Sequence, residues 1–117
     1  MIQIKDVKTL SAEDVHAAHV AGQVLIVDVR EPGEFAAERI AGAVNRPLSS
    51  FDPARLPEIG DPACVVFQCG SGVRSLKAIQ LCRAAGIVVD CHMGGGIGGW
   101  KAGGLPTERP GRTGGIR

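Results

Sequence analysis

One cysteine stands where the chain changes from an apolar segment to a glycine-rich turn. Residues 63–68 have the pattern of a buried strand, and Cys69 follows them directly. A helix is predicted just after the turn, so the thiol is expected to meet the unpaired N–H groups and positive dipole end of that helix. These groups favour a thiolate, which makes Cys69 the candidate catalytic nucleophile. We expect it to occupy a solvent-facing loop.

The turn after Cys69 has the residues needed to hold an anion. Gly70 and Gly72 allow successive backbone N–H groups to turn inwards as a nest, and Arg74 adds a cation with planar donors. Surroundings of this kind lower a thiol pKa from about 8.5 into roughly the 3.5–7.5 range. The alternative is a buried structural cysteine before an ordinary turn, which the glycines and the arginine disfavour.

The remaining cysteines and the histidines are interpreted as structural. The cysteines show no C-x-x-C pair, so we expect thiols in a reducing compartment rather than a disulfide framework or a zinc site. They are Cys64, Cys69, Cys82 and Cys91. His16 and His19 could share a helix face as metal ligands, but solvated surface is favoured, and His92 is interpreted as a strand end. Asp28 and Arg30, after a buried strand, are expected to form a supporting ion pair.

A glycine pattern near the C-terminus has the form of a nucleotide-binding motif. Gly94, Gly96 and Gly99 spell G-x-G-x-x-G after a strand. No helix of useful length is expected before Pro106, and too little chain follows for a second strand with an acidic ribose ligand. We therefore predict no dinucleotide cofactor. The glycines instead let this segment pass close to the anion-binding turn, with Trp100 in the core.

Strand and helix patterns alternate along the chain. Strands are expected at residues 2–4, 24–29, 63–68 and 87–90, with a brief extended piece at 43–47. Helices are expected at about 12–21, capped by Ser11, at 32–40 and at 75–85, with turn and short helix at 48–62 and a glycine loop at 94–99. The unbroken apolar run 24–29 predicts the central strand. This order indicates an α/β fold, with a mostly parallel central sheet and helices on both faces.

Length and composition describe one globular domain. The chain has 117 residues, of which 44% are hydrophobic and 21% charged. We predict a domain over residues 1–108 and a flexible tail over 109–117. Thirteen Lys and Arg against twelve Asp and Glu leave a formal charge of +1, which argues against nucleic acid and membrane surfaces as partners. No secretory signal or membrane span is visible, so the expected location is cytoplasmic.

Three ordered motifs carry a family resemblance. Residues 69–75, with the sequence CGSGVRS, are similar to the C-x-x-G-x-R-S active-site loop of the rhodanese (thiosulfate sulfurtransferase) family. Residues 28–35 and 40–47 resemble its D-V-R-x-x-x-E-F and I-x-G-A-x-N-x-P stretches, and residues 95–106 resemble its G-G-x-x-x-W…G-x-P ending. The departures are Glu38, Arg39, Arg46, Gly98 and Gly99. The chain is thus similar to a single-domain rhodanese, which implies the rhodanese-like fold.

The resemblance implies a sulfur relay through Cys69. The thiolate attacks the outer sulfur of thiosulfate or of a persulfide donor, and the enzyme persulfide passes its sulfur to a thiol, to cyanide or to a sulfur-accepting protein. The substrate-binding residues implied are Gly70, Ser71, Gly72, Val73, Arg74 and Ser75. Arg74 is expected to meet the sulfonate of thiosulfate, and its alternative role is to pair with a carboxylate and hold the loop. The relay needs no metal or organic cofactor.

Two other classes of protein share parts of this pattern. Cysteine phosphatases and arsenate reductases combine a thiolate, a nest and an arginine with C-x5-R spacing, whereas this chain has C-x4-R. One residue fewer gives a tighter cradle, which favours a sulfane sulfur over a phosphate. Rhodanese-like domains also serve as binding or regulatory modules, typically after losing the cysteine. Because Cys69 is present, we favour an enzyme.

Overall fold

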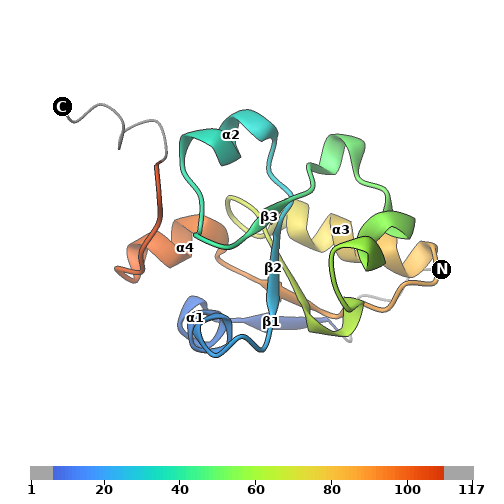
Figure 1. The fold of residues 1–117 in the computed structure, drawn as a ribbon, viewed down its shortest axis with the longest axis horizontal. Helices are drawn as coiled ribbons and strands as arrows, with labels where there is room; N and C mark the ends of the chain where they lie inside the picture. Colours follow the sequence, from blue (N-terminus) through green and yellow to red (C-terminus); the bar gives the residue numbers. More distant parts are fainter. Residues whose placement is uncertain (1–6, 110–117) are drawn as a thin grey trace.

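The computed structural model describes residues 7–109, and within this range the chain forms one five-stranded sheet (Figure 1). The strand order is β1-β5-β4-β2-β3, and each neighbouring pair is parallel. The strands are β1 Lys8–Leu10, β2 Leu25–Asp28, β3 Val44–Asn45, β4 Val65–Gln68 and β5 Cys91–Met93. The predicted α/β class with a parallel sheet is confirmed.

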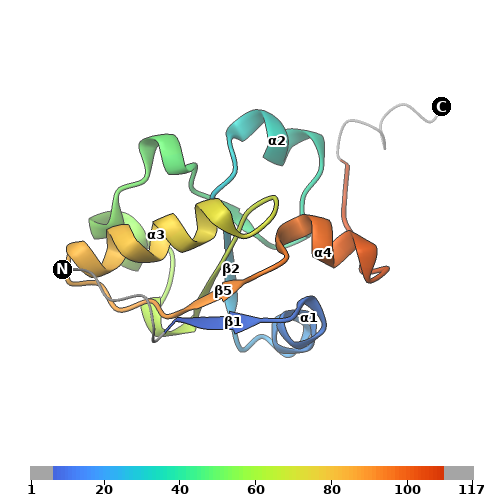
Figure 2. The ribbon, with the colours of Figure 1, turned by 180° about the vertical axis from the view of Figure 1, so that it is seen from behind.

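Helices cover both faces of this sheet (Figure 2). The α-helices are α1 Ala12–Val20, α2 Pro32–Ala37, α3 Val73–Ala84 and α4 Gly96–Ala102. The segment predicted as turn and short helix holds three 3₁₀ helices, Leu48–Ser50, Pro53–Glu58 and Pro62–Cys64. Helices α1 and α4 pack against one face, and α3 packs against the other. The predicted cap of α1 is confirmed, because the Ser11 hydroxyl accepts the Asp14 N–H at 3.1 Å.

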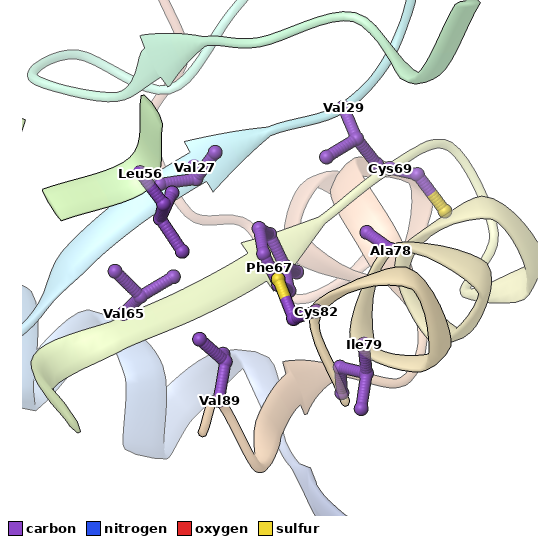
Figure 3. Packing of buried hydrophobic residues seen from close by; sticks show 10 residues of the cluster. All are labelled: Val27, Val29, Leu56, Val65, Phe67, Cys69, Ala78, Ile79, Cys82 and Val89. Carbon is purple, nitrogen blue, oxygen red and sulfur yellow. The ribbon is translucent and has the colours of Figure 1, made fainter. Parts of the chain in front are cut away.

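The interior strands β2 and β4 build a core on each face. Successive side chains of a strand point to opposite faces, so Val27 and Phe67 join the cluster beneath α3. Ile26 and Val66 join the cluster beneath α1 and α4. Figure 3 shows the first cluster, of which Cys69 is itself a member. The candidate nucleophile therefore lies where the core meets the carboxyl edge of the sheet.

Two strand predictions are wrong in position. The central strand is β4, and the run predicted for that place forms its neighbour β2. Residues 87–90 do not pair as a strand, because they lead from the end of α3 back to the sheet. The Ile87 N–H closes that helix on the Cys82 carbonyl at 2.8 Å, and Val89 packs into the core as it passes. Pairing starts only at Cys91, between β1 and β4.

The helices differ from prediction at their ends. Helix α2 ends before the predicted residue 40, because the backbone becomes extended at Glu38. Helix α3 begins two residues early, at Val73, because Gly72 provides an N-cap with a φ of 103°. The segment 94–99, predicted to be a glycine loop, enters helix α4 at Gly96. The predicted loop is thus wrong, although the helix that precedes Pro106 has only seven residues.

The path of the chain places a topological switch point between β2 and β4. From β2 the chain crosses to β3 on one side, and from β4 it crosses to β5 on the other. Ligand sites of open parallel sheets lie at the carboxyl ends of the strands where the order reverses in this way. Cys69 follows β4 at this point, and Arg30 follows β2. The fold therefore brings the two best matched motifs to one place.

Some predictions fall outside the described residues. These are the strand expected at residues 2–4 and residues 110–117 of the expected tail. The domain boundary at residue 108 stays a prediction. In the part of the chain that is described, no helix is both long and apolar enough to cross a membrane.

Candidate active site

Cys69 lies at the carboxyl end of β4 and beside the N-terminus of α3, as predicted. Its Sγ accepts the backbone N–H of Gly72 at 3.0 Å and that of Ser75 at 3.4 Å. The Ser71 N–H and the Ser75 hydroxyl also lower the pKa of this thiol. Gly72 is the N-cap of α3 and Ser75 lies in its first turn, where unpaired amides and the helix dipole favour an anion. The loop thus surrounds the sulfur with hydrogen-bond donors.

The pKa of the Cys69 thiol reflects two opposed effects. Burial raises this pKa, and the hydrogen bonds from Ser75, Gly72 and Ser71 lower it to a net value below the ordinary one. For the buried thiol of Cys82, desolvation raises the pKa to about 11. Burial also raises the pKa of Cys91. Of these three thiols, only Cys69 is shifted towards the reactive thiolate.

Cys69 is 0% exposed, so the expectation of a solvent-facing residue is wrong. The local sequence did not indicate this burial, because it results from packing against the cluster beneath α3 (Figure 3). Within the loop, Ser71 and Val73 are exposed, and Val73 is 75% exposed. The contribution of Ser71 to the site is therefore its backbone N–H rather than its side chain.

Helix α4 holds the Cys69 loop from behind. The Ile97 N–H donates to the Cys69 carbonyl at 2.8 Å, and the Gly98 N–H donates to the Gly70 carbonyl at 3.2 Å. Gly96 permits this approach, because its φ is +61° and a Cβ there would overlap the Cys69 carbonyl oxygen. The prediction that these glycines let the segment pass close to the loop is confirmed.

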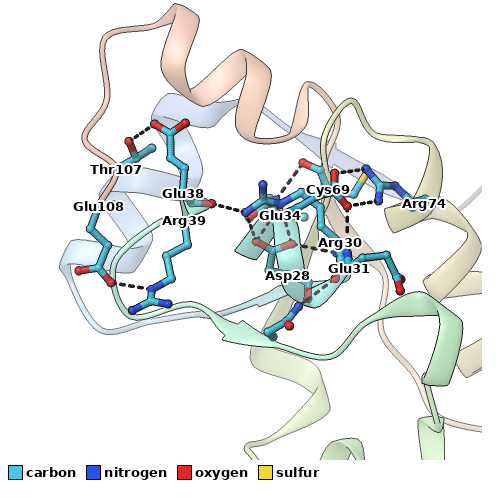
Figure 4. Close-up of polar contacts among 12 residues, drawn as sticks. Asp28, Arg30, Glu31, Glu34, Glu38, Arg39, Cys69, Arg74, Thr107 and Glu108 are labelled. Atoms are coloured by element: carbon cyan, nitrogen blue, oxygen red, sulfur yellow. Dashed lines mark hydrogen bonds and ion pairs between the residues drawn. The ribbon is translucent and has the colours of Figure 1, made fainter. Parts of the chain in front are cut away.

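Arg74 pairs with a carboxylate from α2. Its Nη1 donates to Oε1 of Glu34 at 2.7 Å, and its Nη2 donates to Oε2 at 3.2 Å (Figure 4). This contact, helped by the Glu31 N–H, lowers the pKa of Glu34 to about 2. The same contact raises the pKa of Arg74. The loop-holding role weighed from the sequence is thus present, while contact with a sulfonate stays a prediction.

The predicted ion pair of Asp28 and Arg30 is confirmed and supports this edge of the sheet. Both side chains are buried, and Nη2 of Arg30 lies 2.7 Å from Oδ2 of Asp28. The same Nη2 donates to the Glu38 carbonyl at the end of α2, also at 2.7 Å (Figure 4). The Asn45 side chain donates to the carbonyls of Asp28 and Arg30, each at 2.9 Å. The end of β2 and helix α2 are therefore held in place beside the Cys69 loop.

Two residues of the site were missed by sequence reasoning. His92, interpreted as a strand end, lies within β5 with its Nδ1 2.7 Å from the Ser75 hydroxyl. The sequence indicated Glu34 only as a residue of the D-V-R-x-x-x-E-F stretch. The pairing of β5 with β4 is a tertiary contact that local pattern does not reveal. Two features of the sequence could have indicated these residues. His92 is a histidine in a short apolar segment, and Glu34 is an acidic residue at a fixed motif position.

The other residues considered as ligands have structural contacts. The ring of His16 meets Trp100 edge-on at 5.3 Å between centroids, and Trp100 is 1% exposed, as a core residue should be. Nε2 of His19 lies 2.8 Å from the Ala41 carbonyl oxygen. Both histidines are half-buried, so their interpretation as solvated surface is wrong. The four cysteines are free thiols, and residues 7–109 contain no metal-binding group of three or more ligands.

The parallel sheet, its switch point and the thiol at a helix N-terminus define an α/β domain with a cysteine loop whose sulfur accepts backbone N–H groups. The profile of the rhodanese-like domain family matches residues 11–103. A sulfurtransferase of Allochromatium vinosum is 37% identical, over 74% of this chain and 80% of that protein. An uncharacterised protein of Synechocystis sp. is 38% identical, over 86% of this chain and 56% of that protein. The chain belongs to the rhodanese-like domain family.

A solved structure supports this assignment. The crystal structure of a thiosulfate sulfurtransferase from Pseudomonas aeruginosa has a TM-score of 0.78 and 28% sequence identity. The match covers 88% of this chain and 20% of that chain. The present chain thus spans about half the length of the Synechocystis relative and a fifth of the Pseudomonas chain.

Proposed function

We propose that this protein is a sulfurtransferase that carries a sulfane sulfur on Cys69. The observation that supports this most directly is the Cys69 sulfur, 3.0 Å and 3.4 Å from the backbone nitrogens of Gly72 and Ser75 at the start of α3. A thiolate and a persulfide are both anions, so the same donors suit both states of the cysteine. Membership of the rhodanese-like family and a relative named a sulfurtransferase add support.

Each half of the proposed reaction is a displacement at sulfur. In the first half, the Cys69 thiolate attacks the outer sulfur of thiosulfate, the S–S bond of the donor breaks, and sulfite leaves with the electron pair. A persulfide donor would react in the same way and release a thiolate. In the second half, an acceptor thiolate or cyanide attacks the terminal sulfur, and the Cys69 thiolate leaves with the electrons of that bond. The two displacements predict ping-pong kinetics.

Donor binding must give access to a buried sulfur. The Arg74 guanidinium lies against the loop, because a Cβ at Gly70 would be 3.1 Å from its Nη2. Figure 4 shows Arg74 and Glu34 beside Cys69. We infer that thiosulfate displaces the Glu34 carboxylate from Arg74, which frees the guanidinium for the sulfonate and opens a path to Sγ. Local opening of this kind precedes chemistry in many enzymes with closed sites.

Mass spectrometry tests the proposal. After incubation with thiosulfate, the peptide that contains Cys69 is expected to gain about 32 Da, the mass of one sulfur atom. Cyanide should remove this mass as thiocyanate. The variant Cys69→Ser is expected to show neither effect, and Cys64→Ser, at an exposed thiol, serves as the matched control that shows both.

Two other results would each contradict the proposal. Hydrolysis of aryl phosphates with no mass gain on Cys69 would favour a cysteine phosphatase. If the protein shows neither sulfur uptake nor phosphatase activity, a binding or regulatory module is favoured.

A further inference from the structure

A chain of hydrogen-bonding groups leads from the Cys69 sulfur into the sheet. The Ser75 N–H donates to Sγ at 3.4 Å, and the Ser75 hydroxyl oxygen lies 2.7 Å from Nδ1 of His92. On the other side of the ring, Nε2 of His92 lies 3.2 Å from the Thr9 hydroxyl oxygen. Ser75 is 0% exposed and His92 is 6% exposed. These groups link α3, β5 and β1 behind the loop that holds Cys69.

The Ser75 hydroxyl has one proton and three possible acceptors. The acceptors are the Gly72 carbonyl at 3.1 Å, Nδ1 of His92 at 2.7 Å, and the Cys69 sulfur, whose pKa this hydroxyl lowers. If Nδ1 carries no proton, the hydroxyl must donate its proton to Nδ1, and it cannot then donate to the sulfur. If Nδ1 carries the proton, the ring donates to the hydroxyl oxygen, and the hydroxyl proton can go to the Gly72 carbonyl or to the sulfur.

Once the sulfur is charged, the groups at the two ends of this series of hydrogen bonds, Cys69 and Thr9, favour one placement of the protons. A hydrogen bond to an anion is stronger than one to a neutral acceptor, whether that is the His92 ring nitrogen or the Gly72 carbonyl. The thiolate therefore draws the Ser75 proton, and the His92 proton belongs on Nδ1. Burial lowers the pKa of His92, so the ring is neutral near pH 7 and its bare Nε2 can accept the Thr9 hydroxyl. This placement of the protons does not require a charged imidazole.

We propose that His92 is a positioning residue for Cys69. By holding its proton on Nδ1, it turns the Ser75 hydroxyl proton towards the sulfur of the thiolate and of the persulfide. The inference rests on the proposed function only in treating Cys69 as the nucleophile. Other charged groups near the sulfur are Arg74 on α3, paired with Glu34 on α2, and Asp28 on β2, which acts on Arg74. None of these contacts Ser75 or His92 through a hydrogen bond found within residues 7–109.

Matched variants separate this role from a structural one. His92→Asn places an amide N–H near the position of Nδ1, whereas His92→Gln places it near the position of Nε2. The measurement is the pH dependence of iodoacetamide labelling of Cys69, followed by peptide mapping. We expect His92→Gln and Ser75→Ala to slow labelling about tenfold below the thiol pKa, because one hydrogen bond to the thiolate is lost. His92→Asn should retain the wild-type rate within about twofold.

The double variant and a direct observation of the proton complete the test. Because His92 acts through Ser75, His92→Gln with Ser75→Ala should slow labelling no more than Ser75→Ala alone. Imidazole ¹⁵N NMR should show the proton of His92 on Nδ1, with His16 and His19 as references in the same spectrum. A proton on Nε2, additive effects, or equal labelling of the Asn and Gln variants would each overturn the proposal. Labelling needs no sulfur donor, so failure of persulfide formation in the wild type would count against the proposed function alone.

Discussion

At the scale of single residues, Cys69 combines complete burial with a lowered pKa. Burial disfavours the charged form of a thiol, so the stabilisation of the thiolate must come from the protein and not from water. Most of the donors are backbone amides, which are fixed in place as long as the first turn of α3 stays folded. The charge on the sulfur and the conformation of the loop therefore depend on each other.

The first prediction concerns the order in which the thiols react. When iodoacetamide labelling is followed over pH by peptide mapping, Cys69 should have the lowest midpoint, because its thiolate persists to lower pH than those of Cys82 and Cys91. The exposed Cys64 shows in the same sample that the reagent is active. A lower midpoint for Cys82 or Cys91 would mean that the nucleophile has been assigned wrongly.

The second prediction concerns Glu34, whose carboxylate occupies Arg74. The Arg74 contact lowers the pKa of Glu34 from 4.5 to about 2, so the stabilisation is complete above pH 4.5 and is lost as pH falls towards 2. Near neutral pH, thiosulfate must therefore compete with Glu34. We expect Glu34→Gln to lower KM for thiosulfate about threefold to tenfold, with a smaller change for a neutral persulfide donor.

A control for this variant is available on the surface. Glu58 forms an exposed ion pair with Arg55 at 3.3 Å, and Glu58→Gln should leave KM unchanged. If Glu34→Gln and Glu58→Gln give the same KM as the wild type, Arg74 does not bind the sulfonate. Steady-state kinetics of thiosulfate:cyanide sulfur transfer provide the measurement.

The nucleophile could be predicted because its environment is local. Cys69, the glycines and Arg74 lie within six consecutive residues, and the strand before them and the helix after them are visible as patterns. The partner of Arg74 lies 40 residues away, and the partner of Ser75 lies 17 residues away. Such contacts depend on strand order and helix packing, which a single sequence does not specify.

At the scale of elements, the loop of Cys69 is held between two helix N-termini. Helix α3 supplies N–H groups to the sulfur, and α4 supplies the N–H groups of Ile97 and Gly98 to the carbonyls behind it. The Ser71 N–H shares its peptide unit with the Gly70 carbonyl, so the bond from Gly98 also fixes a donor that lowers the pKa of the Cys69 thiol. A loosened α4 should weaken the site without touching the sulfur.

The third prediction compares two glycines of α4. Gly96→Ala should lower the free energy of unfolding by about 2–4 kcal/mol and reduce sulfur transfer, because its φ is +61° and the new Cβ would overlap the Cys69 carbonyl. Gly99 has open space around the position of a Cβ. Gly99→Ala should therefore stabilise the helix by about 0.5–1 kcal/mol and leave transfer unchanged. Urea unfolding and transfer assays on both variants provide the test, and equal stability would contradict the packing described for Gly96.

Helix α4 is an element that the sequence pattern did not predict. Five glycines in residues 94–99 predict a loop, since glycine is a poor helix former. The helix forms because tertiary contacts use its free N–H groups, which propensity does not measure. In the same way, the apolar residues 87–90 suggested a strand although they cover the core on the way to β5. Existence and type of the long elements could be predicted, but the positions of these short ones could not.

At the scale of the whole molecule, buried and exposed polar contacts link the switch point to the C-terminal segment. Arg30 bonds Asp28 and the Glu38 carbonyl, and the Glu38 carboxylate accepts the Thr107 hydroxyl at 2.5 Å (Figure 4). The same carboxylate accepts Nζ of Lys101 at 2.8 Å. Residues 28–38 and 101–107 are thus connected across the carboxyl edge of the sheet. One domain could be predicted from the length. These contacts could not be predicted, because they join segments about 70 residues apart.

The last prediction follows from the unequal burial of two ion pairs. Arg30→Ala leaves the fully buried Asp28 carboxylate without its partner, which should lower the free energy of unfolding by about 3–5 kcal/mol. Arg55→Ala removes an ion pair whose side chains are 68% and 58% exposed, and should cost at most about 1 kcal/mol. Urea unfolding of both variants measures the difference. Because Arg30 also holds the end of α2, Arg30→Ala should slow sulfur transfer under conditions where the variant is still folded, whereas Arg55→Ala should not. Similar small losses from both substitutions would show that the switch point does not depend on the buried pair.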